Sequence, residues 1–140
     1  MNIAVRYQSR GGNTKTVAEA VAKAAAARAE SIDVPLNGPV DLLFIGGGIY
    51  GFNMDKSLKE YLKGVTPDTA KAIAVFSTGG SMSVAKKITA ALKENGVNPC
   101  EKTLSLRMHV RNCAFLGGKG TVKLSKNELG KIDDFVKAAI

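Results

Sequence analysis

A glycine-rich segment near the amino terminus, residues 9–14, constrains the fold of this chain more than any other stretch. It follows a short apolar run, residues 3–7, that is typical of a buried strand. It precedes an alanine-rich run, residues 16–29, in which Val17 and Val21 recur at helical spacing. Two adjacent glycines between such runs indicate a tight strand-to-helix turn. The chain therefore begins with the strand–turn–helix unit of an α/β protein.

Strand-like and helix-like segments alternate along the chain. Strands that are buried on both faces should read as continuous apolar runs, whereas an edge strand should alternate between apolar and polar residues. Ser125 and Glu128 form the capping box of a last helix. This alternation predicts a parallel sheet with helices on both faces. The predicted strands are 3–7, 31–34, 41–45, 72–76 and an edge strand with Leu104, Leu106, Met108 and Val110. The predicted helices are 16–29, a segment from about Asp55 or Lys56 that Gly64 ends, a segment from Val84 that stops at Gly96, and a last segment with Leu129, Ile132 and Val136.

Residues 9–14 have the composition of an anion-binding turn. Their backbone N–H groups, two hydroxyls and an amide can point at one anion, and the N-terminus of the following helix adds its dipole. A phosphate monoester suits such a turn. The alternative is an ordinary turn in which Asn13 or Thr14 merely caps the helix. The segment is not a P-loop, which needs Lys and then Ser or Thr after its second glycine, nor a dinucleotide fingerprint, which needs three spaced glycines.

The segment resembles the phosphate loop of the flavodoxins, which usually reads Ser or Thr, any residue, Thr or Ser, Gly, Asn, Thr. The residues that match this pattern are Ser9, Gly12, Asn13 and Thr14. Gly11 departs from it, because the family generally has a hydroxyl there. Arg10, at the variable position, can supply a charge-assisted contact to the phosphate instead. The resemblance covers essentially the whole chain and implies a single flavodoxin-like domain, residues 1–140, with a doubly wound, five-stranded parallel sheet of order 2-1-3-4-5.

The resemblance also implies FMN as the cofactor, bound where three glycine-rich loops follow the first, third and fourth strands. Beyond the phosphate loop, the implied cofactor-binding residues are Gly47, Gly48, Ile49, Tyr50 and Gly51, together with Thr78, Gly79, Gly80, Ser81 and Met82. Tyr50 is expected to stack on the flavin, with Ile49 as the next candidate. The alternative is that Tyr50 and Phe52 only cover the core. Ser81 and Ser83 are either ligands or caps of the next helix.

Composition and net charge limit the kinds of partner that the chain is expected to bind. The chain has 140 residues, 45% of them apolar and 23% charged, as expected for one globular domain. Its apolar runs fall short of the roughly 20 residues that span a bilayer, and no signal peptide is apparent, so a cytoplasmic protein without membrane association is expected. The expected oligomeric state is a monomer. Twenty basic and twelve acidic residues give a net charge of +8, dispersed along the chain. This charge predicts redox partner proteins with acidic surfaces and, without a dense basic run, no nucleic-acid binding.

No catalytic or metal-binding constellation is predicted, because Cys100, Cys113 and His109 share no suitable spacing. The expected function is an FMN-binding electron carrier between redox partners, in which the flavin performs the chemistry. Two alternatives stay open. One is a small flavodoxin-fold reductase that takes hydride from a nicotinamide cofactor and passes it to a quinone or another acceptor. The other is a binding module of the same fold without a redox function.

Overall fold

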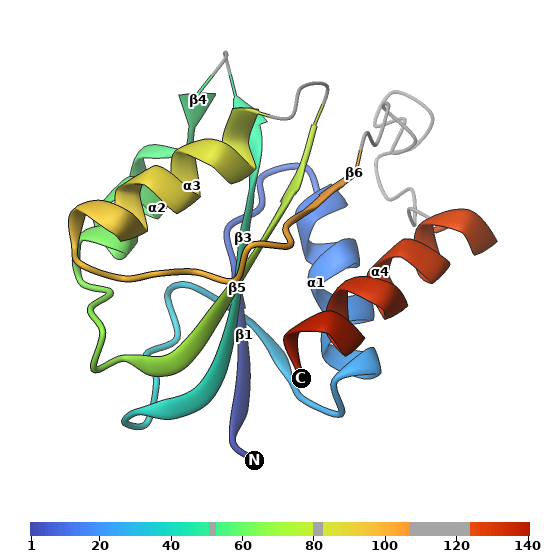
Figure 1. Cartoon of the computed structure of the whole chain (residues 1–140). Coiled ribbons are helices and arrows are strands. Elements are labelled where there is room, and N and C mark those ends of the chain that lie inside the picture. Colours follow the sequence, from blue (N-terminus) through green and yellow to red (C-terminus); the bar gives the residue numbers. More distant parts are fainter. Residues whose placement is uncertain (51–52, 80–82, 107–123) are drawn as a thin grey trace.

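The computed structural model describes residues 1–50, 53–79, 83–106 and 124–140. Its centre is a parallel sheet in the order β2-β1-β3-β5-β6 (Figure 1). The strands are β1 (Ile3–Tyr7), β2 (Ala29–Ser31), β3 (Val40–Tyr50), β5 (Ala70–Thr78) and β6 (Leu104–Leu106). Counted among the parallel strands alone, this is the order 2-1-3-4-5, so the predicted fold class is confirmed. A short strand that the sequence did not predict, β4 (Asn53–Met54), pairs antiparallel with the end of β3.

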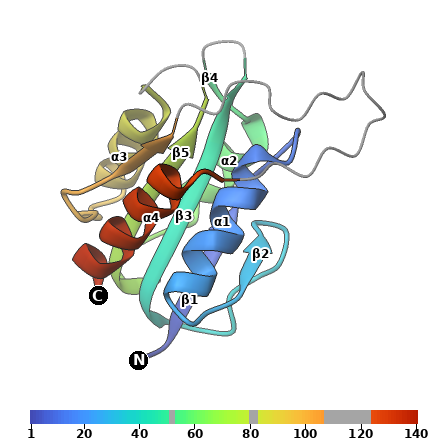
Figure 2. The same ribbon diagram turned by 90° about the vertical axis from the view of Figure 1, so that its right-hand side faces the viewer.

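Two helix layers cover the sheet. The helices α2 (Lys56–Lys63) and α3 (Ser83–Glu94) lie on one face, and α1 (Asn13–Ala24) and α4 (Lys126–Ala139) lie on the other (Figure 1). Figure 2 views the molecule from the side of α1 and α4. Successive residues of β3 alternate between the two cores: Leu43 packs in the core beneath α2 and α3, and Phe44 packs in the core beneath α1 and α4. A strand buried on both faces has no polar side, which is why it reads as a continuous apolar run.

The second predicted strand was misplaced. Helix α1 ends at Ala24 rather than at residue 29, because Ala26 adopts a left-handed φ of 54° and reverses the chain. The strand β2 then occupies Ala29–Ser31, not residues 31–34. Arg6 holds the segment that follows: its Nε donates to the carbonyl of Val34 at 2.8 Å, and its Nη2 donates to that of Pro35 at 3.2 Å. These carbonyls accept hydrogen bonds from a side chain instead of from the backbone of a neighbouring strand.

The last helix confirms one prediction and corrects another. Ser125 Oγ accepts from the backbone N–H of Glu128, whose carboxylate accepts from that of Ser125, so the capping box is present. Ile132 is buried as predicted, but Leu129 is 46% exposed. Phe135 takes the core position instead and meets the ring of Phe44 edge-on, with centroids 5.6 Å apart. The apolar face of α4 is therefore rotated slightly from the predicted one.

The tightest packing of the sheet predicts a stability difference between two Gly→Ala substitutions. A methyl group at Gly46 would collide with the fully buried ring of Phe76, its partner on β5, whereas at Gly130 in α4 it would meet nothing within 4 Å. We expect Gly46→Ala to cost about 1–3 kcal/mol of unfolding free energy. Gly130→Ala should instead stabilise the protein by about 0.5–1 kcal/mol, since it removes a glycine from a helix interior. Urea unfolding of both variants checks this, and a neutral Gly46→Ala would contradict the packing.

Candidate functional site

The loops that follow β1, β3 and β5 meet at one edge of the sheet. The strands end in register: Gly46 pairs with Tyr7 of β1 and with Phe76 of β5, and Gly48 pairs with Thr78. The three loops therefore leave neighbouring positions at the carboxyl edge, uppermost in Figure 1. Ligands of open α/β sheets bind at this edge. The structure brings the first residues of the three predicted cofactor loops together there.

The turn into α1 leaves the helix N-terminus without a side-chain cap. Gly12 is the N-cap residue, with φ 93° and ψ −12°, a left-handed conformation that favours glycine. Its N–H donates to Ser9 Oγ at 3.1 Å, and its carbonyl accepts the first helical bond, from the Thr16 N–H, at 3.0 Å. Neither Asn13 nor Thr14 caps the helix with its side chain, so this part of the alternative is wrong, and anion binding by the turn stays a prediction.

The amide groups at the start of α1 are suited to an anion. The N–H groups of residues 13–15 precede the first helical hydrogen bond, so no carbonyl of the helix accepts from them. The first turn contains no acidic residue. Three amides, the positive end of the helix dipole and a backbone bent by Gly12 together make the kind of cradle that binds phosphate.

Two buried hydroxyls join the start of α1 to the end of β5. Thr14 Oγ1 lies 2.7 Å from Thr78 Oγ1, and the two residues are 1% and 4% exposed. A hydroxyl carries one proton, so one of the pair donates to the other and the accepting hydroxyl keeps its own proton for another acceptor. Both residues were predicted as cofactor contacts from separate loops. Their hydrogen bond fixes the distance between those loops.

The amide of Asn13 offers a further polar group at the turn. Its Oδ1 is buried and has no hydrogen-bond partner among the residues that the structure describes. A buried acceptor without a donor is costly, and this cost is removed when a ligand supplies the donor. A phosphate ester with hydroxyl groups beside the phosphate carries both an anion for these amides and a donor for Asn13 Oδ1.

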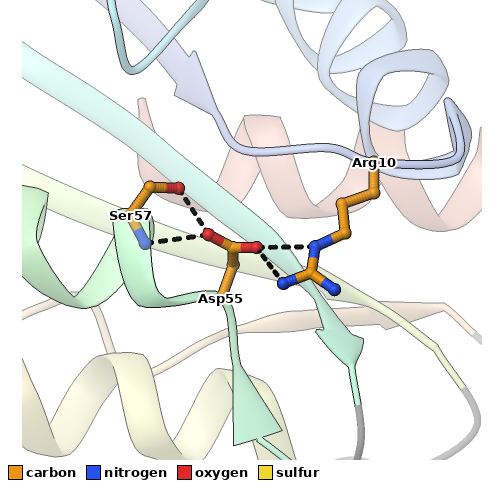
Figure 3. Close-up of polar contacts among 3 residues, drawn as sticks. All are labelled: Arg10, Asp55 and Ser57. Atoms are coloured by element: carbon orange, nitrogen blue, oxygen red, sulfur yellow. Dashed lines mark hydrogen bonds and ion pairs between the residues drawn. The ribbon is translucent and has the colours of Figure 1, made fainter.

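Arg10 is paired with a carboxylate that the sequence analysis missed. Its Nη2 and Nε lie 2.5 and 2.7 Å from Oδ2 of Asp55 (Figure 3). The other oxygen of Asp55, Oδ1, accepts from the N–H of Ser57 at 2.8 Å and so caps α2. Asp55 is thus shared between the N-terminus of α2 and the predicted phosphate loop. An Asp directly before a predicted helix is an N-cap signal, but no sequence pattern pairs it with a residue 45 positions away.

The environment of Asp55 predicts a pH-dependent contribution to stability. The Ser57 hydroxyl and amide, followed by the Arg10 guanidinium, hold the pKa of Asp55 below its usual 3.8. A lowered pKa means that the folded state favours the carboxylate, so the stabilisation is present above about pH 3.8 and is lost as the pH falls through the lowered pKa. We expect the difference in unfolding free energy between the wild type and Asp55→Asn to shrink below that pH in urea titrations. A difference that stays constant down to pH 2.5 would contradict this.

The loop after β3 differs from the prediction. The glycines at 46–48 do not end the strand; β3 continues to Tyr50, and Ile49 and Tyr50 pair with Met54 and Asn53. The predicted loop therefore includes paired residues of two antiparallel strands, β3 and β4, which form a β-hairpin. A Cβ at Gly47 would collide with Cδ2 of Leu58 in α2, so a side chain there would require Leu58 to shift. The backbone of Ile49 and Tyr50 belongs to this hairpin, and the stacking role of Tyr50 stays a prediction.

Part of the predicted site lies beyond what the structure describes. In the loop after β5, Gly79 has φ 134° and its N–H donates to the Leu106 carbonyl at 3.2 Å. The predicted residues outside the described ranges are Gly51, Gly80, Ser81 and Met82, as are Phe52, His109 and Cys113. Within the described ranges, no cluster of three His, Cys, Asp or Glu residues could hold a metal ion, and no helix has the length and apolarity to cross a membrane.

Comparison with solved structures places the fold. A flavodoxin from the domain Archaea matches with a TM-score of 0.77 and 19% identity, over 99% of this chain and 96% of that one. Oxidised flavodoxin 2 from Bacillus cereus matches with a TM-score of 0.70 and 16% identity, over 99% and 97%. A WrbA-like flavodoxin from Agrobacterium tumefaciens matches with a TM-score of 0.65 and 16% identity, over 99% and 94%.

The comparison of sequences gives the family. No curated protein matches the chain. The family model described as a flavodoxin domain matches residues 4–126, which is most of the chain and includes the turn at residues 9–14. The chain therefore belongs to the flavodoxin family.

Proposed function

We propose that this protein binds FMN and carries electrons between redox partner proteins. The observation that carries the proposal is the uncapped N-terminus of α1 behind the left-handed Gly12, tied by the buried Thr14–Thr78 hydrogen bond to the end of β5, from which the second predicted loop leaves. Anion cradle and second loop are thus held together at the edge where the family fold binds its ligand. FMN, when bound, supplies the capacity to accept and release electrons.

The residues of this chain would divide the work of binding. Ser9, Gly12, Asn13 and Thr14 would hold the phosphate, since the structure gathers their amides and hydroxyls at the start of α1. The segments 47–51 and 78–82 would hold the flavin ring, the first from the β3–β4 hairpin and the second from the end of β5. The protein binds and orients the cofactor in this proposal, and it needs no acid or base of its own.

One spectrum tests the proposal. The purified protein should show the visible absorption of a flavin, and the cofactor released on denaturation should be FMN. A colourless protein that takes up no added FMN would show that the chain is a binding module without a redox function. Rapid bleaching of the bound flavin by a nicotinamide cofactor alone would show an enzyme instead of an electron carrier, because a carrier exchanges electrons with protein partners.

The ion pair with Asp55 limits what Arg10 can contribute to FMN binding. Two nitrogens of Arg10 are engaged by Asp55, so its charge is compensated within the protein. We expect Arg10→Ala to weaken FMN binding by up to about fivefold, the value of an exposed ion pair of up to about 1 kcal/mol, because the turn loses its tether to α2. The salt dependence of the affinity should stay unchanged. A smaller salt dependence in the variant would show instead that the Arg10 charge reaches the phosphate directly.

A further inference from the structure

Lysines that are dispersed along the sequence gather in one of the two helix layers. Together α2 and α3 carry six lysines and two glutamates, whereas α1 and α4 carry five lysines and four carboxylates. The layer of α2 and α3 therefore has a net charge of +4, half of the +8 of the whole chain. Surface charges act over roughly 8–10 Å in physiological salt, so a partner senses each layer separately. It meets α2 and α3 as a basic face.

This basic face contains a groove with an apolar floor. The groove lies between α2 and α3 and has a volume of about 340 Å³. Met54, Leu62 and Ala91 lie in its floor, and Lys59, Lys63 and Lys87 lie along its rim. The shape is also fixed: Asn95, after α3, donates through Nδ2 to the carbonyls of Leu62 at 2.7 Å and Val65 at 2.9 Å, at the end of α2. The two helices cannot separate without breaking these bonds. We call this feature the basic groove.

The basic groove adjoins the segment proposed to hold the flavin. Met54, in its floor, belongs to β4 and is the direct partner of Ile49 across the β3–β4 hairpin. The same hairpin carries Ile49 and Tyr50 at the end of β3. A partner seated in the groove would therefore lie against the back of the hairpin that contacts the ring in the proposed complex. Electron exchange needs this kind of proximity between the docking surface and the cofactor.

We propose that the basic groove is the docking surface for an acidic redox protein. An apolar side chain of the partner fills the floor, and carboxylates around it meet Lys59, Lys63 and Lys87. An apolar centre inside a charged rim is the usual anatomy of a protein–protein interface, and opposite charges steer the encounter. Nucleic acid fits less well, because none of the described residues that line the groove is aromatic and could stack on a base. The inference rests on the proposed electron-carrier function.

Two lysine triples of equal charge test the docking surface. In the first variant Lys59, Lys63 and Lys87 become Gln; in the control the α4 lysines, Lys126, Lys131 and Lys137, become Gln. Each triple removes three positive charges, and each includes a lysine that is paired on its own helix, Lys63 with Glu60 and Lys137 with Asp133. The probe is a small acidic ferredoxin, titrated calorimetrically, with the basic cytochrome c as a partner of opposite charge. The groove triple should weaken ferredoxin binding on the order of tenfold, and the control by less than about twofold.

A third variant tests the shape of the groove without changing its charge. Ala90 is exposed and lines the groove, so Ala90→Trp should fill it without changing any charge and should also weaken ferredoxin binding several-fold. Equal losses in both lysine triples, or no loss in Ala90→Trp, would overturn the proposal in favour of a diffuse positive field. If poly-uridine RNA bound more tightly than ferredoxin, and if the groove triple lost this RNA binding, the partner would be a nucleic acid and not an acidic protein. FMN content is measured separately, so a protein without FMN contradicts the proposed function, while the titrations still test the groove.

Discussion

Riboflavin is expected to bind this protein at least roughly 100-fold more weakly than FMN. The two ligands differ only in the phosphate, and the structure offers that group the amides of residues 13–15 at the uncapped start of α1. Hydrogen bonds to a charged group contribute about 1.5–3 kcal/mol each, and about 2.7 kcal/mol corresponds to a 100-fold difference. Fluorescence quenching titrations of the apoprotein with each ligand measure the ratio. Equal affinities would mean that residues 9–14 do not bind the phosphate.

The hydroxyl pair should account for part of this preference. We expect Thr14→Val to lower FMN affinity about tenfold, since one hydrogen bond to a charged group is lost, and to leave riboflavin affinity nearly unchanged. Thr78→Val should lower FMN affinity too, and the double variant should lose less than the sum, because the two hydroxyls lie 2.7 Å apart and act together. Thr69→Val is the control: its hydroxyl accepts from the Thr66 N–H, far from the carboxyl edge of the sheet. Strict additivity of the two site variants would mean that the pair does not act as a unit.

Sequence periodicity predicted the strands that are buried on both faces and the start of the edge strand β6, and it misplaced β2. The run 41–45 reads as a strand because both of its faces contact a core. All three residues of β2 are only half-buried, so no apolar pattern marks this strand. The end of α1 was also missed, because the left-handed residue is Ala26, and alanine normally signals helix continuation rather than a stop.

The predicted site shows the same division between local and long-range information. Composition located the turn at residues 9–14, because glycine and small polar residues between a strand and a helix have local consequences. The Thr14–Thr78 bond joins residues 64 positions apart, and the Arg10–Asp55 pair joins residues 45 apart. Such contacts exist only once the parallel strands are in register. The antiparallel strand β4 likewise depends on where β3 ends. The three glycines at 46–48 predicted an earlier end of that strand than the structure has.

Adjacent glycines in the turn should respond in opposite ways to substitution. At Gly11 the family generally has a hydroxyl; here the φ of Gly11 is not left-handed, and an added Cβ meets nothing within 4 Å. We expect Gly11→Ser to fold normally and to bind FMN about fivefold more tightly, the value of one added hydrogen bond of about 1 kcal/mol. Gly11→Ala lacks the hydroxyl and should show no gain. Titration of both variants with FMN and riboflavin tests whether the gain requires the phosphate.

At Gly12 even a methyl group should be harmful. Its φ of 93° disfavours any L side chain, so Gly12→Ala should cost about 1–3 kcal/mol of unfolding free energy. If the chain relieves that strain by rotating the turn, the amides of residues 13–15 no longer converge, and FMN affinity should fall more than about tenfold while riboflavin affinity changes little. Gly11→Ala is the matched control, because it adds the same methyl group one position earlier without left-handed strain. Similar losses in the two alanine variants would show that loop flexibility, and not the left-handed turn at Gly12, creates the anion cradle.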